Sequence, residues 1–187
     1  MSPDWTIILA GGAAGLAVGV VAGLWVRRRR RSSQGVLRRI AWHQLEDVTV
    51  PDDVDGEIHI DGLLLTPAGI LVLEVRRVEG TVFSGEQLDN WTALRDGGRA
   101  VIRNPLPGLR ARVHAVRELV PPEVPVHGRV LFLGDMQFSG DHPPEVVTLE
   151  ALAKEAGVRE GQPDPLLAGA WQDLKARARR VPASPKG

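Results

Sequence analysis

The pattern of hydrophobic and polar positions divides the chain into one long apolar stretch and a body of shorter runs. The stretch from Trp5 to Val26 contains no charged side chain. As a helix it would rise roughly 33 Å at ~1.5 Å per residue, enough to cross a hydrocarbon core of about 30 Å. A cleaved signal peptide is the alternative, but its positive charge would precede the apolar core rather than follow it. The pattern therefore predicts a retained transmembrane helix.

Charge on the two sides of this stretch predicts its orientation. Arg27 to Arg31 follow it directly, and no basic residue precedes it. Because basic flanks stay in the cytoplasm, we expect a single-pass protein of the inner (cytoplasmic) membrane with its N-terminus outside and its body in the cytoplasm. The arginines are best explained as a stop-transfer anchor against anionic lipid. Small residues recur every four positions in the span and predict a homo-oligomer through one helix face: Gly11, Gly15, Gly19 and Gly23.

The body begins with a predicted helix, Ser32 to Glu46, followed by an acidic connection with a short strand at Val48 to Val50. Two β-rich runs, Glu57 to Leu65 and Ile70 to Arg77, flank the turn signal Thr66-Pro67-Ala68-Gly69. This pattern predicts a β-hairpin.

Later runs predict alternating strands and helices. Strands are expected at 81–83, 100–103, 128–134 and 146–148, and helices at 105–120, 149–156 and 166–180. The continuous apolar run Gly128 to Gly134 suits a strand that is buried on both faces.

Polar side chains on the hairpin form the clearest candidate site. With the turn centred between Pro67 and Ala68, cross-strand partners sum to 135, so Asp61 would stand opposite Glu74 and His59 opposite Arg76. The other face carries a predicted core of Ile60, Leu64, Leu71, Leu73 and Val75. Facing carboxylates repel unless a divalent cation or a guanidinium compensates them, so Arg76 on an ordinary solvated sheet is the alternative to a metal site.

Composition narrows the function classes. The chain has no cysteine, which excludes disulfides and thiolate metal sites. Its formal charge of zero is an average: without the five arginines of residues 27–31 and the single preceding acid, Asp4, the body carries a net −4. Any footprint for nucleic acid must therefore be local.

Several segments together resemble the nuclease-related domain (NERD) family over roughly residues 32 to 157. The resemblance rests on their order and spacing: I60-D61-G62-L63-L64-L65-T66-P67-A68-G69-I70, V72-L73-E74-V75-R76, G80-T81-V82-F83, W91 and N104-P105-L106. It implies an α/β, restriction-endonuclease-like fold with a central mixed sheet flanked by helices, here preceded by one transmembrane helix. The expected organisation is an anchor (1–31), a NERD-like domain (32–157) and a C-terminal helix and tail (158–187).

The resemblance also implies roles for three residues. Asp61 and Glu74 would be metal ligands for Mg²⁺ or Mn²⁺, and Arg76 stands where a catalytic lysine is expected. The chain departs from the family pattern at Arg76, at Gln34 in place of a helical glutamate, at Gly108 in place of a glutamine, and at Gly62, where a histidine is frequent.

Two functions follow as expectations. The first is a membrane-anchored, metal-dependent nuclease in which Asp61, Glu74 and Arg76 are catalytic and helix arginines contact the phosphate backbone: Arg110, Arg112 and Arg117. The second is a non-catalytic module that binds nucleic acid or a protein at the cytoplasmic face of the membrane. A structural membrane assembly factor is a third class.

Overall fold

The computed structural model describes residues 33–53 and 56–181, and the chain divides into two compact units, residues 1–37 and residues 38–187. The predicted span from Trp5 to Val26 and its glycine face lie outside the described residues. Among the helices of the described ranges, none combines the length and the apolar character that a membrane crossing requires.

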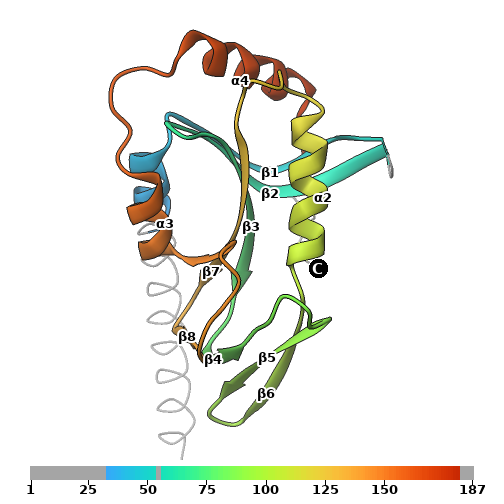
Figure 1. The fold of residues 1–187 in the computed structure, drawn as a ribbon, viewed down its shortest axis with the longest axis vertical. Helices are drawn as coiled ribbons and strands as arrows, with labels where there is room; N and C mark the ends of the chain where they lie inside the picture. The colour runs from blue at the N-terminus through green and yellow to red at the C-terminus, as the bar shows by residue number, and fades with distance from the viewer. Residues whose placement is uncertain (1–32, 54–55, 182–187) are drawn as a thin grey trace, which may run out of the picture. The chain divides into compact units, whose positions relative to one another are not determined.

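The described part of residues 38–187 contains two β-sheets and the helices α2 to α4 (Figure 1). The larger sheet is mixed and runs in the order β10-β1-β2-β3-β7-β9, and the smaller sheet runs β6-β5-β4-β8. The strands are β1 (His43–Asp52), β2 (Gly56–Thr66), β3 (Gly69–Arg77), β4 (Gly80–Phe83), β5 (Asn90–Arg95), β6 (Gly98–Arg103), β7 (Val126–Leu133), β8 (Met136–Phe138), β9 (Val146–Thr148) and β10 (Arg179–Arg180). The helices are α2 (Leu106–Arg117), α3 (Leu149–Ala156) and α4 (Pro165–Arg177). The predicted α/β architecture with a mixed sheet and flanking helices is confirmed.

The predicted hairpin is confirmed, and its register holds as far as Gly62↔Leu73; the predicted cross-strand pairs Asp61–Glu74 and His59–Arg76 lie beyond the last paired residues. β2 and β3 pair from Thr66↔Gly69 to Gly62↔Leu73, so partners sum to 135. Gly69 has φ +117°, and a side chain there would collide with the carbonyl of Pro125. That carbonyl accepts a hydrogen bond from the Ile70 amide at 2.9 Å, so the turn needs glycine both for its dihedral angle and for this close approach.

The predicted helix from Ser32 to Glu46 is wrong in its second half. The helix spans 33–40, and the chain becomes strand β1 at His43. β1 pairs along almost its whole length with β2, from His43↔Leu65 to Asp52↔Gly56, and the Trp42 amide already donates to the Leu65 carbonyl at 2.9 Å. Long-range pairing thus overrides a local helical stripe, which periodicity alone could not reveal. The predicted short strand at Val48 to Val50 is the centre of this longer one.

The smaller sheet continues two strands of the larger one. β3 leads into β4, and β7 leads into β8. β3 pairs parallel with β7 in the larger sheet, and β4 pairs parallel with β8 in the smaller sheet. At the junction the Gly80 amide donates to the Asp135 carbonyl at 2.8 Å, while Gly80 and Gly134 adopt φ of +89° and +127°. A side chain at either glycine would meet a neighbouring carbonyl, of Leu94 or of Val78 respectively. These two glycines therefore allow one parallel pair to bend into a second sheet.

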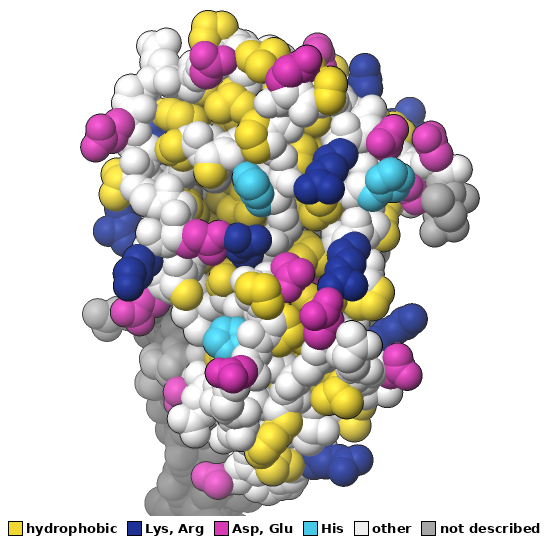
Figure 2. Space-filling model, in the orientation of Figure 1, with side chains coloured by type: hydrophobic (Ala, Val, Ile, Leu, Met, Phe, Trp, Pro, Cys, Tyr) yellow, Lys and Arg dark blue, Asp and Glu magenta, His cyan; other side chains and the backbone are white. Residues whose placement is uncertain are grey.

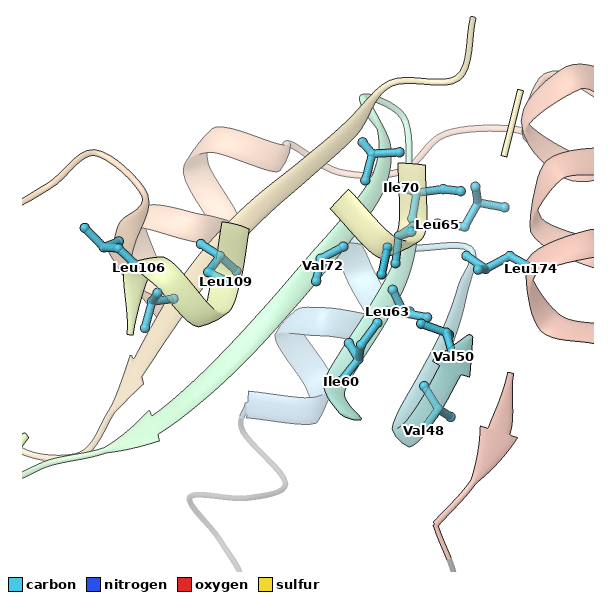
Figure 3. Close-up of a cluster of buried hydrophobic side chains, with 14 of the residues drawn as sticks. Val48, Val50, Ile60, Leu63, Leu65, Ile70, Val72, Leu106, Leu109 and Leu174 are labelled. Atoms are coloured by element: carbon cyan, nitrogen blue, oxygen red, sulfur yellow. The ribbon is translucent and has the colours of Figure 1, made fainter. Parts of the chain in front are cut away.

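Both faces of the larger sheet are buried. On one face α2 packs against β1, β2, β3 and β7, and the core there includes Leu63, Leu65, Ile70, Val72 and Leu109 (Figure 3). On the other face lie the predicted core residues Leu64, Leu71 and Leu73, and α3 contacts β7 and β9. α4 contributes Trp171 and Leu174 to the first core, so the C-terminal helix belongs to the same compact unit.

Candidate functional site

Asp61 lies where β2 and β3 separate. The last paired residues are Gly62 and Leu73; beyond them β3 continues beside β7, while β2 continues beside β1. The Val75 amide therefore loses its partner across the hairpin and donates instead to Asp61 Oδ2 at 2.7 Å. The Asp61 carboxylate replaces a backbone acceptor at this point, and its side chain is 26% exposed.

Glu74 is buried under the start of α2 and is paired with two arginines. Its residue exposure is 1%. Oε1 accepts a hydrogen bond from Arg76 Nη2, and Oε2 accepts one from Arg112 Nη1 at 3.3 Å. Arg112 is fixed by a second bond, from its Nε to the His59 carbonyl at 2.7 Å. Both carboxylate oxygens of Glu74 are therefore occupied by guanidinium groups.

Burial raises the pKa of the Glu74 carboxyl above its ordinary value. Arg76 and Arg112 act in the opposite direction, and the nearby charge of Asp61 adds to the rise. The effect of Asp61 means that the two carboxylates are close enough to repel each other. Asp61, Glu74, Arg76 and Arg112, here called the Glu74 cluster, hold two acids and two guanidinium groups, so the formal charges of the cluster balance.

Gly108 makes the contact between Arg112 and Glu74 possible. A Cβ at residue 108 would lie 2.7 Å from Arg112 Nη1 and 3.6 Å from Glu74 Oε2. Gly108 and Arg112 are four residues apart on α2, so they share one face of the helix. The sequence analysis noted Gly108 only because a glutamine is expected there. The feature that could have indicated an internal ion pair is a glycine one helical turn before an arginine on the helix that covers the sheet.

His59 lies between two carboxylates at the outer side of the cluster. Its Nδ1 is 3.5 Å from Asp61 Oδ1, and its Nε2 is 3.5 Å from Asp47 Oδ1. Asp47 falls opposite Asp61 in the β1–β2 register and has φ +51°, an unusual value for a residue with a side chain. Asp47 was missed because its segment was predicted to be mostly a connection.

The four hairpin residues that were predicted to form one polar cluster thus form two separate pairs. His59 contacts Asp61, and Arg76 contacts Glu74. The helix arginines are engaged within the protein: Arg110 with Glu86, Arg112 with Glu74, and Arg117 with the Val126 carbonyl at 3.1 Å. Gln34 belongs to the other compact unit.

Asn104 has a structural role that the sequence did not predict. Its Oδ1 accepts a hydrogen bond from the amide of Leu106, the first residue of α2, at 2.9 Å. Its Nδ2 donates to the carbonyls of Glu86 and Leu88 at 3.2 and 2.8 Å. The Asn-Pro-Leu segment therefore ties the loop after β4 to the helix that carries Gly108 and Arg112.

The arrangement is a poor fit for a two-carboxylate metal centre. Within the described residues no group of three or more His, Cys, Asp or Glu side chains is placed to hold a metal ion. Glu74 could ligate a cation only after Arg76 or Arg112 had moved, and the cation would then lie beside two positive charges. Binding of Mg²⁺ or Mn²⁺ by Asp61 and Glu74 stays a prediction.

Comparison with known proteins gives one match. Residues 27–133 match the family described as nuclease-related domain (NERD). These residues include the whole β2–β3 hairpin, Gly108 and Arg112. No curated protein and no solved structure matches the chain.

Proposed function

Because the chain belongs to the nuclease-related domain (NERD) family, we propose that it is a non-catalytic member, which binds nucleic acid or a protein partner at the cytoplasmic face of the membrane. The observation that carries this proposal is the occupation of both Glu74 oxygens by Arg76 and Arg112. The membrane anchor rests on the sequence pattern and the restriction-endonuclease-like ancestry on the family resemblance, and both are part of the proposal.

The chemistry of the cluster supports this reading. Hydrolysis of a phosphodiester by this kind of site needs carboxylates that are free to hold a cation and a base that can accept a proton. The guanidinium group of an arginine keeps its charge, so residue 76 does not supply the base that a lysine could. Glu74 is the counter-ion of two cations, and Asp61 holds the amide of Val75. Each charged group of the cluster already has a structural task.

A metal-dependent nuclease is the second candidate, and one observation favours it. Asp61 lies close enough to Glu74 for its charge to raise the pKa of the Glu74 carboxyl, and Arg76 is 41% exposed. A nucleic-acid phosphate that drew Arg76 toward itself would release one oxygen of Glu74. Arg76 would then steady the phosphate, while Asp61 and Glu74 would hold Mg²⁺ or Mn²⁺.

The decisive experiment is a cleavage assay with the full chain in detergent micelles. Single- and double-stranded DNA and RNA are incubated with Mg²⁺ or Mn²⁺, beside the variants Asp61→Ala and Glu74→Ala. We expect no cleavage by the wild-type protein above the level of the variants. Cleavage that needs the metal and that both variants lose would reject the non-catalytic proposal in favour of the nuclease.

A second measurement separates absent metal binding from absent catalysis. Binding of Mn²⁺ to the full chain can be followed by electron paramagnetic resonance. We expect weak or no binding by the wild-type protein and stronger binding by Arg112→Ala, which frees Glu74 Oε2. The matched control is Arg117→Ala, which removes an arginine of the same helix that hydrogen-bonds the Val126 carbonyl instead of Glu74.

A further inference from the structure

The outward face of the smaller sheet combines exposed apolar side chains with unpaired arginines. Register and alternation define it: Trp91, Val82 and Ala93 point into the core, so their neighbours along each strand point out. The outward positions, here called the β4–β6 face, are Thr81, Phe83, Asn90, Thr92, Leu94, Arg99, Val101, Arg103 and, from β8, Gln137.

Three apolar side chains on this face are exposed to solvent. Phe83 is 42% exposed, Leu94 44% and Val101 60%. In the lower part of Figure 2, where Figure 1 places β5 and β6, exposed hydrophobic side chains lie near a basic one. They alternate with polar side chains across the strands, because Phe83 and Val101 both neighbour Thr92. The face is thus a mixed surface rather than a continuous apolar patch.

The charges of the face have one sign. None of its positions holds an acid. Among the described residues, neither Arg99 nor Arg103 has an ion pair or a side-chain hydrogen bond, in contrast to Arg95, which lies 3.6 Å from Glu79. Arg99 and Arg103 stand four residues apart on β6, roughly 14 Å along the strand, on either side of Val101. The body is acidic overall, so a local acid-free surface of this kind is the exception that nucleic-acid binding requires.

We propose that the β4–β6 face binds single-stranded nucleic acid. Phe83 would stack on a base, Val101 and Leu94 would contact neighbouring bases or sugars, and Arg99 and Arg103 would contact phosphates. This combination of an exposed ring with cations along a track is how proteins hold single strands without reading their sequence. Thr92 supplies a donor and an acceptor for polar base edges, while Gln137 donates a hydrogen bond to the Thr81 hydroxyl at 3.3 Å.

The inference extends the proposed function by naming the ligand and its surface. It uses no residue of the Glu74 cluster, so the two proposals can fail separately. Cleavage that needs Asp61 and Glu74 would overturn the non-catalytic proposal but would not bear on the inference about the β4–β6 face. Absence of nucleic-acid binding at the β4–β6 face, together with absence of cleavage, would overturn only this inference.

The experiment measures binding of a fluorescently labelled oligodeoxythymidine to the full chain in neutral nanodiscs by anisotropy. We expect Arg99→Gln combined with Arg103→Gln to weaken binding at least tenfold at low salt and to reduce the salt slope by about one to two. Phe83→Ala should weaken binding about tenfold, as loss of one stacked base does. The matched controls are Arg39→Gln combined with Arg180→Gln, for equal loss of charge, and Leu166→Ala, for an exposed apolar side chain on α4.

Equal affinities for the face variants and the controls would overturn the proposal, as would no binding at low salt. Hydrogen exchange of β5 and β6 identifies other occupants of the face. Protection on adding the oligomer supports nucleic acid. Protection that appears instead on moving to anionic nanodiscs would assign the face to the membrane surface, and protection that rises with protein concentration would assign it to a second copy of the chain.

Discussion

The guanidinium of Arg112 reaches the carboxylate of Glu74 through the space that a side chain at residue 108 would fill. Arg112 Nη1 lies 3.3 Å from Glu74 Oε2 and 2.7 Å from the position that a Cβ at residue 108 would take. Glycine at this position of α2 therefore completes the neutralisation of the only charged residue in the buried core of the described chain.

Gly108→Ala tests this relationship. A methyl group would push the end of the flexible Arg112 side chain away from Glu74, so the pKa of Glu74 should rise further above its ordinary value. Carboxyl-carbon NMR titration of the wild-type protein and the variant measures the change.

The matched control for this substitution is Gly169→Ala, which lies in α4 with no atom within 4 Å of the added methyl group. Alanine in a helix interior is better than glycine by about 1 kcal/mol, so this control should be stabilised. Gly108→Ala should gain less than the control. An unchanged Glu74 titration in Gly108→Ala would mean that Arg112 does not depend on the glycine.

Glu74→Gln should change the pH dependence of stability. Burial raises the pKa of Glu74, so this group stabilises the fold at pH values below its ordinary pKa, and that contribution is lost as the pH rises through the raised pKa. The difference in free energy of unfolding, wild type minus Glu74→Gln, should therefore increase as the pH is lowered from 7 toward 4.5.

Denaturant unfolding at several pH values measures this difference, with Glu160→Gln, an exposed site, as the control. A difference that increases toward high pH instead would show that Arg76 and Arg112 outweigh burial and hold the pKa of Glu74 below its ordinary value.

Asp61→Ala should destabilise the point where β2 and β3 separate. The Val75 amide donates to Asp61 Oδ2 at 2.7 Å, and removal of the acceptor leaves this amide without a partner. A buried donor without a partner costs about 1–3 kcal/mol, and because this hydrogen bond is only part-buried we expect a loss near the lower end of that range. Asp61→Asn keeps an acceptor oxygen and should lose less, and Asp173→Ala, exposed on α4, should lose almost nothing. Equal losses for alanine and asparagine at residue 61 would show that charge, not the hydrogen bond, stabilises this position.

Gly134→Ala should disrupt the junction between the two sheets. Gly134 has φ +127°, and a Cβ there would collide with the Val78 carbonyl. Gly140→Ala is the matched control, because Gly140 has φ +84° but no atom within 4 Å of an added Cβ. The control should cost about 1 kcal/mol through backbone strain, and Gly134→Ala clearly more. Thermal unfolding compares the two, and similar losses would argue against the collision.

The local pattern of the sequence determined the hairpin, its turn and its register. Alternation of side chains has a period of two and the turn at Thr66 to Gly69 is short, so a single pairing buries the apolar positions, and the structure has that pairing. The same reasoning placed α2, β7 and α3. Apolar positions at helical spacing indicated α2, a continuous apolar run indicated β7, and proline, glycine or a capping residue lies at the ends of all three elements.

Tertiary structure alone decided what the hairpin residues do. Residues 43–46 continue a helical pattern, yet they form β1 because β2 offers a full ladder of hydrogen bonds. Asp61 and Glu74 were predictable as neighbours, but their tasks were not, because the Val75 amide and the Arg112 guanidinium come to them from a diverging strand and a helix more than 30 residues away. A charge pattern shows which groups can meet; the long-range packing of α2 over the sheet decides which of them are already satisfied.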